Sequence, residues 1–150
     1  MNTRQTVEKF LAQKRLAVVG VSRSGKEFSN VAFRELRQKG YQVIPVNPNA
    51  DTIEGERCYH RLTDIEPKPG AALVVTSSAQ TAGVVKDAAA AGIRLLWIQQ
   101  GSDSTDALEL AKAKGIEVAS GDCILMFAEP VASFHRFHRW VWKLLGKLPK

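Results

Sequence analysis

Short apolar runs alternate along the chain with segments whose apolar residues recur at helical spacing. The runs have the length and composition of buried parallel strands. They predict strands at residues 16–21, 41–46, 71–75, 95–98 and 116–119. The segments between them, each followed closely by a glycine, predict helices at residues 28–39, 79–91 and 105–114. Residues 51–69 predict an irregular connection with one helical turn near residues 62–65.

This alternation of strand and helix is typical of a parallel sheet that helices cover on both faces. The crossover connections of such a sheet are right-handed. We therefore expect an α/β fold, a Rossmann-like three-layer sandwich with a five-stranded parallel sheet. No linker rich in Gly, Ser or Pro divides the chain, so residues 1–150 are expected to form a single domain.

The last segment, residues 129–150, has a different pattern. Its apolar residues recur three and four apart, as do its basic residues, which predicts an amphipathic helix with a basic face. The apolar stripe is Phe134, Phe137, Val141, Leu144 and Leu148, and the basic stripe is Arg136, Arg139, Lys143 and Lys147. Packing on the domain is the favoured role. Contact with a second subunit in a homodimer and binding to an anionic membrane surface are the alternatives.

The formal net charge is +6, but its distribution argues against a nucleic-acid interface. Residues 130–150 carry five basic and no acidic side chains, so the other 129 residues hold 16 basic and 15 acidic ones. These 129 residues are nearly neutral and lack the basic face with interleaved aromatic residues that is typical of nucleic-acid binding. No apolar stretch reaches the ~20 residues that span a bilayer. Two cysteines, Cys58 and Cys123, make neither a disulfide framework nor a metal site. We expect a cytoplasmic protein without stable membrane insertion.

The loop after the first predicted strand, residues 20–26, is the strongest candidate for a ligand site. Ligands of open parallel sheets bind at the carboxyl ends of the strands. The loop's small residues let backbone amides approach an anion, and the following helix offers free N–H groups. These small residues are Gly20, Ser22, Ser24 and Gly25. Arg23 and Lys26 add positive charge, so the loop favours a phosphate or pyrophosphate. The alternative is a tight strand–helix turn with two solvated cations.

The common phosphate-binding motifs are absent from this loop. Ser22 stands where the dinucleotide-binding G-x-G-x-x-G motif has its second glycine, and there is no Walker sequence. The second predicted strand ends in Val46-Asn47-Pro48, without the acidic residue that holds the ribose of NAD. NAD(P) binding, with Arg23 or Lys26 on a ribose phosphate, is therefore the weaker alternative.

Four blocks of sequence resemble one known family. They are V-V-G-V-S-R-S-G-K, G-Y-Q-V-I-P-V-N-P, I-x-G-E-R-C-Y-x-x-L-T-D-I and W-I-Q-Q-G, in this order within residues 7–127. The chain looks like the small, free-standing CoA-binding domain proteins, which are similar to the N-terminal CoA-binding domain of the succinyl-CoA synthetase alpha subunit. The resemblance implies that the ligand is coenzyme A (CoA) or an acyl-CoA.

Matched block by block, the resemblance assigns parts of CoA to parts of the chain. The loop that begins at Gly20 is assigned to the CoA phosphates, with Ser22, Arg23, Ser24, Gly25 and Lys26. The residues assigned to the adenosine end are Val46, Asn47, Pro48 and Asn49. The residues assigned to the pantetheine arm are Thr76 and Ser77, with Gln100 and Gly101 as weaker candidates near its end. The synthetase family often has a lysine at the adenosine end. This chain has none there, which leaves the 3′-phosphate to Arg23 or Lys26.

No catalytic arrangement of residues is recognisable in the sequence. The phosphorylated histidine of the synthetases belongs to a second domain, which these 150 residues do not include. We therefore expect a protein that binds CoA or an acyl-CoA without catalysis and without a metal. Cys123 is the basis of an alternative with chemistry, because it follows the fifth predicted strand and is therefore expected near the ligand end of the sheet. A thiol beside the CoA sulfur would make a thiol-dependent CoA redox protein or an acyl-CoA enzyme. The simpler role of a free cysteine is that of a small buried apolar residue.

Overall fold

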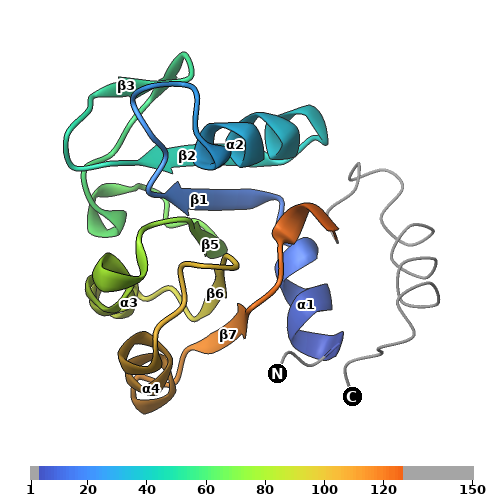
Figure 1. Ribbon diagram of the computed structural model, residues 1–150, viewed down its shortest axis with the longest axis vertical. Coiled ribbons are helices and arrows are strands. Elements are labelled where there is room, and N and C mark those ends of the chain that lie inside the picture. Colours follow the sequence, from blue (N-terminus) through green and yellow to red (C-terminus); the bar gives the residue numbers. More distant parts are fainter. Residues whose placement is uncertain (1–3, 127–150) are drawn as a thin grey trace.

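The computed structural model describes residues 4–126, and its centre is a five-stranded parallel sheet (Figure 1). The strands are β1 Arg15–Val19, β2 Gln42–Val46, β5 Ala71–Val74, β6 Leu95–Ile98 and β7 Glu117–Ser120. Their order across the sheet is β2-β1-β5-β6-β7, so the chain moves outward from β1 to β2 and then returns to the other side of β1. The predicted α/β fold with five parallel strands is confirmed.

Helices cover both faces of the sheet (Figure 1). They are α1 Arg4–Leu11, α2 Phe28–Gln38, α3 Ser78–Ala91 and α4 Thr105–Ala113. Successive residues of a strand point to opposite faces. Leu16 and Val18 of β1 accordingly share a core cluster with α1 and α2, whereas Ala17 and Val19 share one with α3 and α4. The result is the predicted sandwich of helices, sheet and helices.

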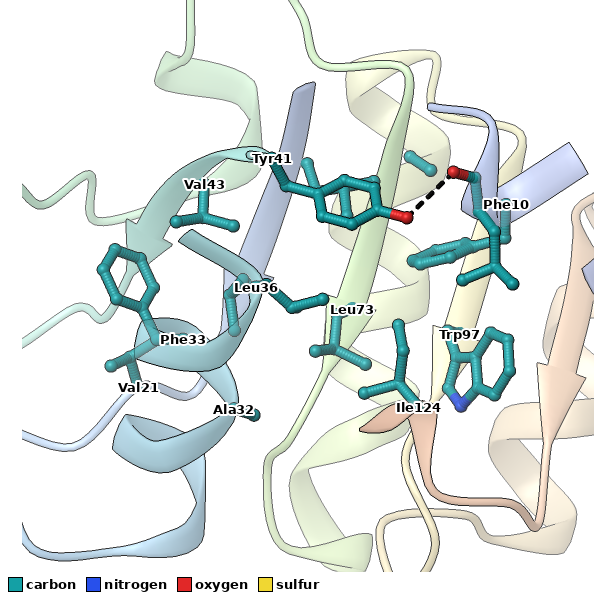
Figure 2. Packing of buried hydrophobic residues seen from close by; sticks show 14 of the residues in the cluster. Phe10, Val21, Ala32, Phe33, Leu36, Tyr41, Val43, Leu73, Trp97 and Ile124 are labelled. Atoms are coloured by element: carbon teal, nitrogen blue, oxygen red, sulfur yellow. Dashed lines mark hydrogen bonds between the residues drawn. The ribbon is translucent and has the colours of Figure 1, made fainter. Parts of the chain in front are cut away.

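The sequence pattern predicts no helix where α1 lies. This helix has eight residues, and its buried apolar side chains are Val7, Phe10 and Leu11. Phe10 packs edge-on against Trp97 of β6, with ring centroids 5.5 Å apart and an interplanar angle of 62° (Figure 2). The Tyr41 hydroxyl donates to the carbonyl of Leu11 at 3.0 Å (Figure 2). Because a helix this short is marginal alone, packing on the sheet stabilises it.

The connection between β2 and β5 contains more structure than the sequence predicts. The strands β3 Thr52–Ile53 and β4 Glu56–Arg57 form an antiparallel hairpin. Its turn contains Glu54 and Gly55, which have φ angles of +54° and +76°. Strands of two residues are too short for a hydrophobic period to reveal them. The 3-10 helix η1 Leu62–Asp64 confirms the predicted helical turn.

A second 3-10 helix, η2 Ile124–Met126, follows β7 and ends the described part of the chain. The amphipathic helix predicted for residues 129–150 lies outside the described residues. Within residues 4–126, no helix is long and apolar enough to cross a membrane.

Candidate functional site

A groove of about 1280 Å³ opens at the carboxyl ends of β1, β2, β5 and β6. The strands β1 and β5 are neighbours, but α2 follows β1 on one face of the sheet and α3 follows β5 on the other. The loops after these strands therefore diverge, which leaves room for a ligand at this point of the sheet. Twelve of the fourteen predicted site residues line the groove. These are Gly20, Ser22, Arg23, Ser24, Val46, Asn47, Pro48, Asn49, Thr76, Ser77, Gln100 and Gly101.

Gly20 is the residue at which three of the loops converge. Its φ of +101° ends β1 at Val19, two residues before the predicted end of the strand. A Cβ at this position would lie 3.0 Å from both the N and the Cγ2 atoms of Thr76. The Gly20 amide also donates to the carbonyl of Val46 at 3.0 Å. A residue with a side chain would therefore separate the loops after β1 and β5.

Serine hydroxyls shape the loop after β1. The Ser24 amide donates to Ser22 Oγ, and the Lys26 amide donates to Ser24 Oγ, both at 3.1 Å. The Ser22 amide donates to Ser29 Oγ of α2 at 3.0 Å. Three loop amides are thus satisfied inside the protein. Ser22 Oγ donates to Ser24 Oγ at 3.0 Å, so the side chains of this loop that remain to donate to an anion in the groove are the Ser24 hydroxyl and the Arg23 guanidinium.

The same loop is anchored from behind by α2 and by the β3–β4 hairpin. Asn30 Nδ2 donates to the carbonyl of Ser22 at 2.8 Å and to Glu54 Oε2 at 2.9 Å. Asn30 Oδ1 accepts from the Glu27 amide at 3.2 Å, and Arg34 Nη1 donates to Glu54 Oε2 at 2.9 Å. Asn30 is fully buried, so these bonds are protected from water. The hairpin therefore helps to hold the loop in place.

Two predicted site residues, Gly25 and Lys26, do not line the groove. Gly25 turns the chain with a φ of +75°, and its carbonyl accepts from Arg34 Nη1 of α2 at 3.2 Å. Lys26 follows this turn. Arg23 does line the groove, and its Nη1 lies 3.5 Å from the carbonyl of Asn49. Of the two cations predicted to meet a phosphate, the structure places Arg23 at the groove and Lys26 outside its lining.

At the end of β2, Asn47 holds two loops together. Its Nδ2 donates to the carbonyl of Val21 at 2.9 Å, and its Oδ1 accepts from the Asn49 amide at 2.8 Å. Both ends of the side-chain amide are therefore used inside the protein. Val46 and Pro48 add apolar surface beside it. Asn47 shapes this wall of the groove.

Polar groups gather beneath the loops after β5 and β6. Thr81 Oγ1 donates to the carbonyl of Ser102 at 2.6 Å and lies 2.9 Å from Thr76 Oγ1. Gln99 Oε1 accepts from the Ile124 amide at 3.1 Å. Gln99 and Ser102 line the groove and are 5% and 4% exposed. Within residues 4–126, neither the Gln99 Nε2 nor the Ser102 hydroxyl has a hydrogen-bond partner. The groove thus contains two buried groups that a ligand would satisfy.

Part of the groove comes from elements in which the sequence predicts no site. His60 and Arg61, just before η1, line it, and so does one face of α3. This face consists of Gln80, Gly83, Val84, Lys86, Asp87 and Ala90. The alanine-rich pattern of α3 and the irregular pattern of residues 51–69 give no indication of ligand contact. Gly83 is the one residue whose type could have indicated ligand contact on α3. Glycine destabilises a helix interior, and its presence there often means that another group lies close to the helix.

Neither cysteine lines the groove. Cys58 is buried, and its thiol donates to the carbonyl of Asn47 at 3.6 Å. Burial raises the pKa of the Cys58 thiol, which disfavours the reactive thiolate. Cys123 follows β7 and is half-buried. Within residues 4–126, the thiol-dependent alternative therefore has no thiol in the wall of the groove.

Comparison with known proteins assigns the chain to a family. The profile of the family described as "CoA binding domain" matches residues 14–129, which include all five strands of the sheet and the loops that form the groove. The chain belongs to the CoA-binding domain family. The family predicted from the four sequence blocks is confirmed.

Other members and relatives differ in size. The chain is 32% identical to the uncharacterized protein YneT of Bacillus subtilis over 111 residues, 74% of this chain and 82% of that protein. It is 31% identical to the ADP-forming acetate–CoA ligase II of Archaeoglobus fulgidus over 118 residues, 70% of this chain and 17% of the ligase. A solved structure of a conserved hypothetical protein from Pyrococcus furiosus has 32% identity and a TM-score of 0.71, and the match covers 75% of this chain and 97% of that one. The family domain therefore occurs both in small proteins and as a part of a large ligase.

Proposed function

We propose that the protein binds CoA or an acyl-CoA in the groove without catalysing a reaction. The observation that carries this proposal is that loops from four strands, in a chain of the CoA-binding domain family, meet in one groove. The pyrophosphate is held by Gly20, Ser22, Arg23 and Ser24, with Gly25 and Lys26 flanking the loop. The adenosine end borders Val46, Asn47, Pro48 and Asn49. The pantetheine arm runs along Thr76 and Ser77 toward Gln100 and Gly101.

The residues present fit the chemistry of this ligand. Because Gly20 has no side chain, the loops after β1 and β5 can lie close together. Arg23 supplies a positive charge for the phosphates. The buried Gln99 Nε2 and Ser102 hydroxyl are donors, and the pantetheine arm carries amide carbonyls that need donors when they leave water. A volume of about 1280 Å³ exceeds the ~300–1,000 Å³ of a typical ligand pocket and suits a long, extended molecule.

Binding without catalysis is supported by how the titratable groups of the groove are arranged. Activation of a nucleophile requires a base within hydrogen-bond reach of it. His60 Nε2 instead pairs with Asp51 Oδ1 at 2.9 Å, at an exposed edge. In the described part of the chain, no serine, threonine or cysteine of the groove bonds to a histidine. The two free cysteines agree with a cytoplasmic location, which is part of the proposal.

Titration calorimetry on one preparation tests the ligand. CoA and acetyl-CoA are expected to bind, whereas NADH and NADPH are expected to give no binding heat. NADPH is the test of the NAD(P) alternative, in which Arg23 or Lys26 would hold the ribose phosphate. Binding of NADPH without binding of CoA would contradict the proposal.

A matched pair of variants tests the position of the phosphates. Arg23→Ala removes a cation that lines the groove, and Lys26→Ala removes a neighbouring cation that does not. We expect Arg23→Ala to weaken CoA binding by about 1–3 kcal/mol, as for a charged hydrogen bond, and to do so less at high salt. Lys26→Ala should have a smaller effect. Equal affinities of Arg23→Ala and wild type would place the phosphates elsewhere.

A further inference from the structure

We infer that Arg61 and Lys86 form a subsite for the 3′-phosphate of CoA, which makes the groove select CoA over ligands that lack this group. The inference rests on the proposed function, since it assumes that CoA occupies the groove. Both residues line the groove, and neither was a candidate in the sequence. They come from different elements, because Arg61 precedes η1 and Lys86 lies on α3.

A hydrogen bond fixes the segment that carries Arg61 against α3. Asp87 Oδ2 accepts from the Leu62 amide at 3.0 Å. Leu62 directly follows Arg61, and Asp87 directly follows Lys86, so the bond holds the two cationic residues at the same side of the groove. Leu62 is also buried, which anchors the segment further. Tertiary contacts therefore bring the segments that carry Arg61 and Lys86 together.

None of the ion pairs found in residues 4–126 includes Arg61 or Lys86. The adjacent carboxylate of Asp87 accepts from the Leu62 amide, and neighbouring His60 pairs with Asp51. An anion in the groove would thus meet a guanidinium and an ammonium together. A phosphate monoester, which accepts from both, is the complementary group.

The surface of α3 beside Lys86 suits the nucleoside that carries this phosphate. Gly83 lies one helical turn before Lys86 on the same face of α3. A Cβ at Gly83 would meet nothing within 4 Å, so the missing side chain leaves open space in the groove. Val84 and Ala90 continue this face with small apolar groups. A flat base lying here would place a phosphate on its ribose near Lys86.

The end of β2 supplies no cation of its own for the 3′-phosphate. The family resemblance suggests a lysine at the adenosine end, and residues 46–49 contain none. Lys26, one of the two substitutes expected from the sequence, does not line the groove. Arg23 reaches toward Asn49 from the loop assigned to the pyrophosphate. Arg61 and Lys86 are the remaining Arg and Lys residues in the described lining.

The experiment compares CoA with 3′-dephospho-CoA by titration calorimetry. The test variant is Arg61→Gln with Lys86→Gln. The control is Arg57→Gln with Lys112→Gln, which removes the same charge from exposed residues outside the groove. We expect wild type to bind CoA about tenfold more tightly than dephospho-CoA, as for charge-assisted hydrogen bonds. The test variant should lose about tenfold in affinity for CoA but less than about twofold for dephospho-CoA. The control should keep both affinities.

Different results separate the inference from the function on which it rests. Equal losses for both ligands in the test variant would overturn the inference, as would a control variant that loses the preference for CoA. If wild type binds CoA and dephospho-CoA equally and Arg23→Ala weakens both, the subsite is absent while the proposed function stands. If wild type binds neither ligand, the proposed function itself fails. Circular dichroism of each variant confirms that the exposed substitutions leave the fold intact.

Discussion

Gly20 meets two requirements that alanine would not meet. It has a φ of +101°, and the space beyond its Cα is filled by the backbone nitrogen and methyl group of Thr76. Gly25, five residues later, meets the first requirement alone, because its φ is +75° and a Cβ there would meet nothing within 4 Å. The two glycines therefore allow backbone strain to be separated from steric contact.

Alanine at each position should have different consequences. Positive φ costs a non-glycine residue about 1–2 kcal/mol, which is the loss expected in the unfolding free energy of Gly25→Ala. Gly20→Ala should lose roughly 1–3 kcal/mol more, because its methyl group must displace the backbone of Thr76. It should also weaken CoA binding, since the loops after β1 and β5 would separate. Urea unfolding and calorimetry measure both effects. Equal stability of the two variants would show that the contact with Thr76 relaxes without cost.

Among the elements, α1 depends on a contact with β7 as well as on its apolar face. Glu117 of β7 accepts from Thr6 Oγ1 at 3.0 Å and from Lys9 Nζ at 2.9 Å. These two hydrogen bonds lower the pKa of the Glu117 carboxyl, the bond from Lys9 most of all. The Glu117 side chain is 46% exposed, so solvent screens the pair and its contribution is under about 1 kcal/mol.

The pH dependence of this contribution has a definite sign. A carboxyl whose pKa is lower in the folded state stabilises the fold above its unfolded pKa of about 4.3, and the effect disappears as the pH falls through the folded pKa. Glu117→Gln should therefore be less stable than wild type near neutral pH, and the difference should vanish in acid. Urea unfolding between neutral and acidic pH measures this, with Glu109→Gln on α4 as the control. A difference that stays constant across this pH range would exclude the ion pair as its cause.

Some elements of this fold could be predicted from the sequence and others could not. Strands such as 95–98 could be predicted because a buried parallel strand is a continuous apolar run. The loops that line the groove could be predicted because ligands of open parallel sheets bind at the carboxyl ends of the strands. The helix α1 and the β3–β4 hairpin could not be predicted from the sequence, because they are short and are stabilised by tertiary contacts. Arg61 and Lys86 are 25 residues apart in the sequence. The Asp87–Leu62 hydrogen bond joins the two segments that carry them, and such a bond leaves no pattern in the sequence.

For the molecule as a whole, the strand order determines where the groove lies. Because β1 and β5 are adjacent while their helices cross to opposite faces, their loops separate at the carboxyl edge of the sheet. The two core clusters and the groove lining that the structure describes come from residues 4–126. The family match ends at residue 129. The basic segment that follows accounts for five of the six net positive charges.

Removing residues 130–150 tests what this segment adds. We expect the shortened chain to keep the CoA affinity of the full chain, because the described groove and core lie entirely before the cut. If the apolar stripe expected from the sequence packs on the domain, the unfolding free energy should fall by several times the ~1.5–3 kcal/mol of one buried large apolar side chain. Calorimetry with CoA and urea unfolding measure the two quantities. Light scattering gives the mass, which would fall if the segment instead joined two subunits. Loss of CoA binding in a shortened chain that remains folded would place the segment in the site. Unchanged stability and mass would contradict the expected packing.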